Sequence, residues 1–113
     1  MHRTGKYNAR KTTVDGITFD SKMEASRYGV LVLMQRAGLI SGLRCHPVYE
    51  LQPAFEHNTR TVAAITYEGD FEYLENGVLV CEDVKGVRTP VFNVKAKMFL
   101  YHYPDIDFRV LQR

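Results

Sequence analysis

The chain has 113 residues, of which 45% are hydrophobic and 25% charged; this is enough for one globular core and excludes disorder over the whole length. Its two cysteines, Cys45 and Cys81, are too few for a disulfide framework and lack zinc-finger spacing, so we expect free thiols in a reducing compartment. No apolar run approaches the ~20 residues that span a bilayer, and the polar start does not resemble a signal peptide. We therefore expect a soluble cytoplasmic protein with no membrane partner.

Basic residues are concentrated at the start of the chain, although the formal net charge is only +2. Arg3, Lys6, Arg10 and Lys11 all precede the first acidic residue, Asp15. We predict a flexible basic N-terminal arm over residues 1–11 and a single domain over residues 12–113. The basic segment either binds phosphates or is a solvated terminus, and composition alone does not distinguish the two.

The first predicted elements are a hairpin and a helix. Asp15-Gly16 lies between short apolar stretches and predicts a two-residue hairpin turn. Ser21 and Glu24 fit a capping box, and Gly38 is a suitable residue just beyond a helix end, so we place a helix at about residues 21–37. Its apolar residues recur at helical spacing and include Met23, Val30, Leu31 and Met34.

Strands are expected next. Residues 48–52 form one candidate, which Pro53 ends, and residues 62–67 form a second. A third begins near Asp70 and returns through an Asn76-Gly77 turn as residues 78–85. Together these segments predict an antiparallel meander.

A second helix and a last strand complete the expected fold. Thr89 is a good N-cap and Pro90 suits the first helical position. The residues that we expect on one helix face are Val91, Val94, Met98 and Tyr101. Pro104-Asp105 ends the helix, and residues 107–111 alternate as a strand that we place beside the hairpin. The prediction is an α/β fold with a mixed sheet, in the order helix, three-stranded meander, helix, strand.

The segment from Cys81 to Gly86 has the clearest chemical pattern. In a strand Asp83 and Lys85 share a face, whereas Glu82 lies on the face of Val84. If the chain turns at Asn76-Gly77, Asp70 lies opposite Asp83. Two neighbouring carboxylates repel each other by a few kcal/mol at an effective dielectric of about 20, so a fold that keeps them suggests a cation such as Mg²⁺ between them.

Lys85 and Glu24 complete the candidate site. An ammonium beside such a cation can orient water or neutralise charge on a phosphodiester. Helical spacing places Glu24 at the edge of the buried stripe, from where it can reach the sheet. The alternatives are an ordinary surface ion pair between Asp83 and Lys85, an Asp70 that is only a turn residue, and a Glu24 that serves only its capping box.

Three blocks carry a family resemblance. Phe19-Asp20-Ser21-Lys22-Met23-Glu24-Ala25, Gly69-Asp70-Phe71 and Glu82-Asp83-Val84-Lys85-Gly86 resemble, in order, the leading Glu helix, the split Asp and the (D/E)xK motif of the PD-(D/E)xK nuclease superfamily. Within it the sequence is similar to a family of small, mostly phage-encoded, endonuclease-like proteins. The resemblance covers about residues 7–111, and Gly69 replaces the motif's literal proline. It implies a restriction-endonuclease-like core.

The resemblance also implies site roles. Glu24, Asp70 and Asp83 would bind one or two Mg²⁺ ions, with Mn²⁺ as a substitute, and Lys85 would assist the attacking water. The second helix often presents a basic group in such enzymes; Lys95 is the first candidate and Lys97 the next, with a solvated helix face as the alternative. The residues expected to bind DNA are Arg3, Lys6, Arg10, Lys11, Arg88 and Lys97.

The leading hypothesis is a Mg²⁺-dependent endodeoxyribonuclease acting on branched DNA such as Holliday junctions, in phage recombination or replication within the host cytoplasm. The small chain leaves no separate element for reading base edges, which favours recognition of backbone and shape. A resolvase would be a homodimer. An apolar dimer patch could come from Met34, Leu39, Tyr101 and Tyr103, although we expect these residues in the core.

Two other classes stay open. One is a non-catalytic nucleic-acid-binding module that retains the nuclease fold. The other is a structural or inhibitory phage protein that binds a host factor, which would fit the low net charge but would leave the aligned carboxylates unexplained.

Overall fold

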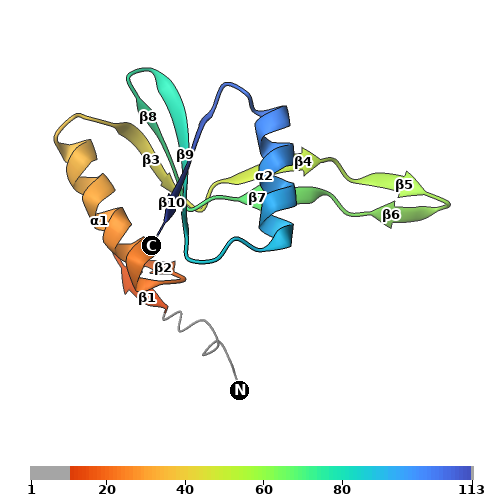
Figure 1. Cartoon of the computed structure of the whole chain (residues 1–113), viewed down its shortest axis with the longest axis horizontal. Coiled ribbons are helices and arrows are strands. Elements are labelled where there is room, and N and C mark those ends of the chain that lie inside the picture. The colour runs from red at the N-terminus through yellow and green to blue at the C-terminus, as the bar shows by residue number, and fades with distance from the viewer. Residues whose placement is uncertain (1–10, 113) are drawn as a thin grey trace.

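A four-stranded mixed sheet forms the centre of the computed structural model, which describes residues 11–112. Its strand order is β10-β9-β8-β3 (Figure 1). β3 (Ser41–Cys45), β8 (Phe71–Glu75) and β9 (Val78–Lys85) are antiparallel neighbours, and β10 (Asp107–Gln112) runs parallel to β9. The chain is therefore a small α/β protein, and the last strand lies beside the hairpin as predicted.

Two helices cover opposite faces of β9. α1 (Lys22–Arg36) packs on the face of Val80, where its Tyr28 and Leu31 join one core cluster. α2 (Pro90–His102) packs on the face of Cys81 and contributes Phe92 and Phe99 to a second cluster. Because side chains alternate along a strand, successive residues of β9 are buried in different cores.

The local turn and cap signals are confirmed. β1 (Thr12–Val14) and β2 (Ile17–Phe19) form a hairpin whose turn residues, Asp15 and Gly16, have φ values of 53° and 76°. Asn76 and Gly77 have φ values of 52° and 78°, as a tight hairpin turn requires. Ser21 and Thr89 cap the two helices by accepting hydrogen bonds from the backbone N–H groups of Glu24 and Phe92.

The strand assignment before residue 70 was partly wrong. β3 was not predicted, although it supplies the sheet's third antiparallel strand. The segment expected as one strand over residues 62–67 is divided between β6 (Arg60–Val62) and β7 (Ile65–Glu68). β4 (Val48–Gln52) was predicted correctly, but it pairs with β7 outside the central sheet; β5 (Phe55–His57) pairs with β6.

The expected helix faces were also wrong at several positions. In α1, Met23 and Val30 are 38% and 46% exposed, and the buried residues are Glu24, Ala25, Tyr28 and Leu31. In α2, three of the residues expected together on one face, Val91, Val94 and Tyr101, are exposed, and the buried residues are Phe92 and Phe99. Four residues were also expected in the core. Leu39 and Tyr101 are instead 61% and 81% exposed, whereas Met34 and Tyr103 are half-buried.

Cys45 and Cys81 are free, as expected, although only Cys81 is fully buried. Within residues 11–112, no helix is both long and apolar enough to cross a membrane.

Candidate active site

Asp70 and Asp83 lie on neighbouring strands at one end of the central sheet. The pairing of β8 with β9 begins at Phe71 and Glu82, so Asp70 precedes the first paired residue. Its backbone N–H donates to the Glu82 carbonyl at 3.0 Å, and its Oδ2 accepts from the Val84 N–H at 2.6 Å. The structure thus places Asp70 beside Asp83, as the Asn76-Gly77 turn predicted.

Asp83 is 1% exposed, and two side chains hold its carboxylate. The Tyr67 hydroxyl donates to Oδ2. The Lys85 ammonium lies 3.2 Å from Oδ1 and 4.6 Å from the centre of the Phe92 ring. No donor in the described part of the chain is aligned to hydrogen-bond Oδ1, so this buried oxygen has the lysine only as an ion-pair partner.

Glu24 approaches from the first turn of α1. Ser21 caps the helix as a capping box predicts, but the Glu24 side chain turns to His46, whose Nε2 is 2.9 Å from Oε1. Glu24 is 5% exposed. Burial is the main reason that its pKa is raised; the pair with His46 opposes this shift, and the charges of Asp20 and Asp83 add to it.

The charges of the three carboxylates influence one another's pKa values. Burial, followed by the neighbouring charge of Asp83, raises the pKa of Asp70 to about 8; the Val84 N–H lowers it, and the charge of Glu24 raises it further. Carboxylic acids with such pKa values are typical of functional sites, because a fold gains nothing in stability by holding acids together. We call Glu24, Asp70, Asp83 and Lys85 the carboxylate centre.

The carboxylate centre fits a hard divalent cation by its chemistry. It offers carboxylate oxygens, which Mg²⁺ and Mn²⁺ prefer, and one buried oxygen of Asp83 without a hydrogen bond. A cation would also relieve the repulsion by Asp83 that, after burial, raises the pKa of Asp70. In residues 11–112, no group of three or more histidine, cysteine or acidic side chains is arranged to hold a metal ion. Mg²⁺ keeps several waters and uses few protein ligands, so an open arrangement suits it.

The other predicted site residues lie apart from this centre. Lys95 is half-buried and Lys97 exposed on α2, and within residues 11–112 neither forms an ion pair or hydrogen bond with the three carboxylates. Lys11 and Arg88 are exposed. Arg3, Lys6 and Arg10 lie outside the described residues, as does most of the segment expected to be flexible.

Sequence reasoning missed His46 and Tyr67. His46 joins β3 to β4 with a φ of 55°, and its backbone N–H donates to the Asp70 carbonyl at 2.9 Å. Tyr67 is a buried residue of β7 whose ring packs against Phe92 and Phe99. The sequence carries no signal for either, because both reach the centre through contacts between segments distant in the chain.

A proline could not replace Gly69. Its N–H donates to the Pro47 carbonyl at 2.9 Å, a bond that a proline could not make. A Cβ at this buried position would also meet the Cys81 sulfur at 2.8 Å. The close approach of the two segments therefore requires glycine just before Asp70.

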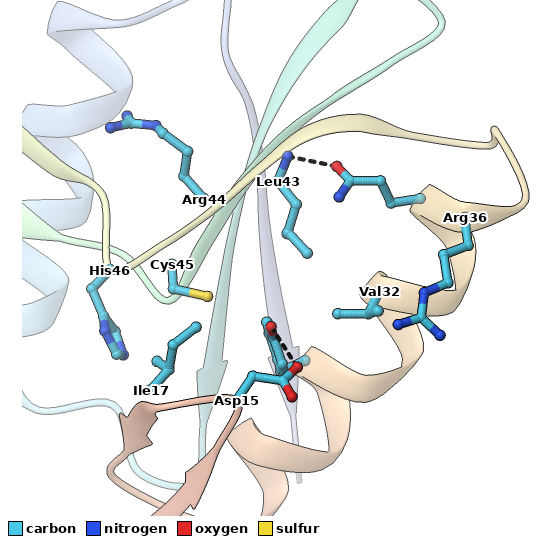
Figure 2. A pocket seen from close by; sticks show the side chains of 10 residues that line it. Asp15, Ile17, Val32, Arg36, Leu43, Arg44, Cys45 and His46 are labelled. Atoms are coloured by element: carbon cyan, nitrogen blue, oxygen red, sulfur yellow. Dashed lines mark hydrogen bonds between the residues drawn. The ribbon is translucent and has the colours of Figure 1, made fainter.

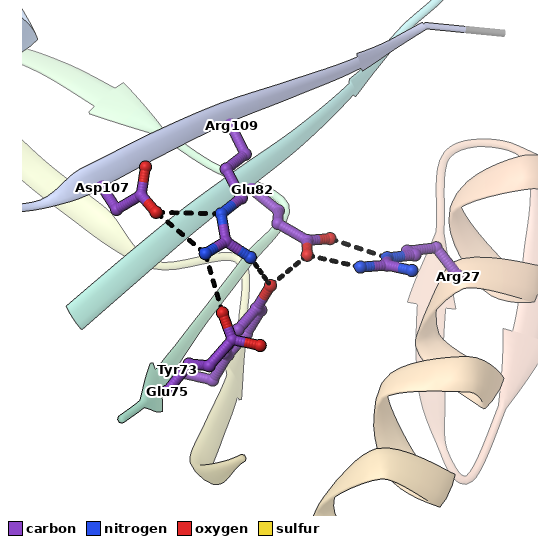
Figure 3. Close-up of polar contacts among 6 residues, drawn as sticks. All are labelled: Arg27, Tyr73, Glu75, Glu82, Asp107 and Arg109. Carbon is purple, nitrogen blue, oxygen red and sulfur yellow. Dashed lines mark hydrogen bonds and ion pairs between the residues drawn. The ribbon is translucent and has the colours of Figure 1, made fainter. Parts of the chain in front are cut away.

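Glu82 faces α1, opposite Asp83, and is fully buried (Figure 3). Arg27 donates to both of its carboxylate oxygens, at 2.8 and 2.6 Å, and the Tyr73 hydroxyl donates to Oε2. Arg109 of β10 extends this network to Glu75 at 2.7 Å and to Asp107 at 2.8 Å. The Arg27 pair ties α1 to β9, the strand that carries Asp83 and Lys85, and the Arg109–Glu75 pair ties β10 to β8.

A cavity of about 710 Å³ lies between α1, β3 and the β1–β2 hairpin (Figure 2). Leu43, Ile17 and Val32 contribute apolar walls, and Asp15 accepts a hydrogen bond from Tyr28 at 3.0 Å. His46 also lines this cavity and contacts Glu24, so the cavity adjoins the carboxylate centre on the side of Glu24.

Fold and site together define a small α/β protein with buried acidic residues and a lysine gathered at one end of a mixed sheet. A family sequence model described as "Protein of unknown function (DUF1064)" matches residues 4–113, and the chain belongs to this family. No curated protein and no solved structure matches the chain.

Proposed function

We propose that the protein is a metal-dependent DNA endonuclease with a restriction-endonuclease-like core, and that the carboxylate centre hydrolyses phosphodiester bonds. The single observation that carries the proposal is the position of Asp70, Asp83 and Lys85 on adjacent strands, with the buried carboxylate of Glu24 on α1 near enough to influence Asp70 by its charge. Repulsion between neighbouring acids lowers stability, so stability alone does not explain their placement. A divalent cation bound between them would be attracted by both carboxylates.

Glu24, Asp70 and Asp83 would hold Mg²⁺, or Mn²⁺ in its place. When bound, the ion would supply positive charge to the phosphate oxygens and favour deprotonation of water. In the reaction, a water oxygen bonds to phosphorus and one P–O ester bond breaks, leaving a phosphomonoester and a hydroxyl.

Lys85 has the position to act on the reacting groups. Its ammonium lies between Asp83 and the face of Phe92, and its side chain is 28% exposed, so it can reach a substrate. There it would neutralise negative charge on the phosphate or orient the attacking water. Tyr67 and His46 would hold the acids: Tyr67 fixes Asp83, and His46 fixes Glu24.

Branched DNA is the substrate that we favour, and the cytoplasm the compartment. Within residues 11–112, two helices are largely committed to covering the sheet, so no separate helix is free to read bases in a groove. Recognition would then depend on backbone and shape. Lys11, Arg88 and Lys97 are exposed cations that could bind phosphates.

The test is incubation of the pure protein with Mg²⁺ and a synthetic four-way junction, a duplex and a single strand of the same sequence. We expect cleavage of the junction and none with a chelator. Asp83→Asn and Lys85→Met should each lower the rate at least on the order of a hundredfold.

The matched control is Glu72→Gln, which changes another buried carboxylate of the same sheet to an amide. Glu72 accepts from Tyr49 at 2.7 Å and from Arg44 at 3.0 Å and belongs to no part of the carboxylate centre. This variant should cut at nearly the original rate. Equal cutting of all three DNAs would remove the preference for branches. Folded protein that binds DNA equally well with chelator and never cuts would instead be a non-catalytic binding module.

A further inference from the structure

A two-stranded β-ribbon, residues 53–66, projects away from the rest of the molecule (Figure 1). It contains β5 and β6, and every one of its residues is exposed. Its turn is tight, with Asn58 and Thr59 at φ values of 49° and 64°. An isolated two-stranded ribbon is at best marginally stable in water, so a projection of this length points to a contact outside the domain.

The β-ribbon has an apolar cross-strand pair that nothing in residues 11–112 covers. Phe55 and Val62 are paired across the strands and are 44% and 38% exposed. His57 pairs with Arg60 nearer the tip, on the same face, because alternate residues share a face. Each of β5 and β6 also has an unpaired edge within the described chain. Such edges and apolar pairs are typical of surfaces that associate with another chain.

The charges of the β-ribbon and of its base are self-complementary. Arg60, at the tip, is the ribbon's only lysine or arginine and is exposed. At the base, the exposed side chains of Glu50 on β4 and Glu68 on β7 supply negative charge. Two ribbons aligned antiparallel about a two-fold axis would place each tip beside the partner's base and their apolar pairs together.

We propose that the β-ribbon is a homodimerisation surface, and that its occupant is the β-ribbon of a second copy of this chain. Nucleic acid is the less suitable partner. A segment that binds a polyanion usually carries several cations, whereas residues 53–66 combine a single arginine with Glu56 and are formally neutral. The inference does not depend on the proposed nuclease activity.

Sedimentation of the full chain over a range of concentrations tests the proposal. We expect a monomer–dimer equilibrium that weakens with added salt. Phe55→Ala combined with Val62→Ala should raise the dimer dissociation constant about tenfold or more. Val91→Ala is the matched control, because this residue of α2 is 64% exposed but lies outside the β-ribbon; it should leave the constant unchanged. Circular dichroism would confirm that each variant is folded.

A charge exchange gives the sharper result. In one variant, Arg60→Glu makes the tip negative like the base. In a second variant, Glu50→Lys and Glu68→Lys together make the base positive like the tip. Each variant alone should be monomeric, because its tip and its partner's base would repel each other. Mixed together, the two should form a heterodimer, because both tip-to-base contacts are then complementary. A wild-type chain that stays monomeric at all concentrations would overturn the proposal. A dimer that these changes leave unaffected would also overturn it. If the variants instead bind DNA more weakly than the wild type without any change in oligomeric state, the β-ribbon binds nucleic acid and the proposal is wrong.

Discussion

Nε2 of His46 lies 2.9 Å from Oε1 of Glu24, and the backbone N–H of the same histidine donates to the Asp70 carbonyl at 2.9 Å. One residue thus links the acid on α1 to the acid at the start of β8. It does so with a φ of 55°, a conformation that costs free energy for most residues but is less unfavourable for histidine and asparagine.

Replacing His46 with alanine should release the Glu24 side chain and weaken its orientation. If Glu24 binds the metal ion as proposed, we expect about a 10- to 100-fold loss of the cleavage rate at limiting Mg²⁺. His46→Asn is the informative companion, because asparagine tolerates the positive φ and its amide can donate to Glu24. Titration of the rate with Mg²⁺ measures both variants. If alanine and asparagine behave alike while both proteins are folded, the contact with Glu24 has no role in positioning.

Arg27→Ala should lower the free energy of unfolding by about 3 kcal/mol, because it leaves the fully buried Glu82 without its cation. Arg44→Ala is the control: its ion pair with Glu72 is similar in length, at 2.9 Å, but the arginine side chain is 60% exposed. That change should cost less than about 1 kcal/mol. Urea unfolding measures both, and equal losses would contradict the role given to burial.

The stability of the protein should depend on pH through Asp70. Its pKa rises from 3.8 to about 8 on folding, so between these values the folded state holds a proton that the unfolded state has lost. The free energy of unfolding should therefore be highest near pH 4 and fall as the pH rises toward 8. Asp70→Asn should flatten this decline, whereas Asp105→Asn, at an exposed site, should not.

If the carboxylate centre binds Mg²⁺ as proposed, the ion should oppose the same decline, because it would bind the deprotonated acids of the folded state. Thermal unfolding at several pH values, with and without the ion, measures this effect. A stabilisation by Mg²⁺ that is as large at pH 5 as at pH 8 would argue against binding at Asp70.

Gly69→Ala should destabilise the fold by about 1–3 kcal/mol, since the new methyl group would lie 2.8 Å from the Cys81 sulfur. Shortening the neighbour in the double variant with Cys81→Ala should recover part of the loss. Chemical denaturation of the two single variants and the double variant gives the coupling. Strictly additive losses would show that the sulfur is not the obstacle.

The parts of the fold that could be predicted are those with local causes. Asp15-Gly16 and Asn76-Gly77 adopt the positive φ values of hairpin turns, and Ser21 and Thr89 cap their helices through bonds to residues three positions away. The proximity of Asp70 and Asp83 could also be predicted, because the turn at Asn76-Gly77 sets the register that places the two acids side by side.

The parts that could not be predicted depend on contacts between distant segments. Ser41–Cys45 is a weak strand by composition and is held by its pairing with β8. Helical spacing correctly placed Glu24 at the edge of the buried stripe of α1, but it gave no sign of the contact with His46 or of the exposure of Val30. Tyr67 and His46 likewise reach the carboxylate centre only through tertiary packing, which no local spacing encodes.

β10 is the parallel neighbour of β9, the strand that carries Asp83 and Lys85, and α2 joins the two strands. Without β10, that flank of β9 would be bare and Glu75 would lose its contact with Arg109. β9 would then be an edge strand, and an exposed edge invites pairing with another chain. β10 therefore protects the acid-bearing strand from aggregation.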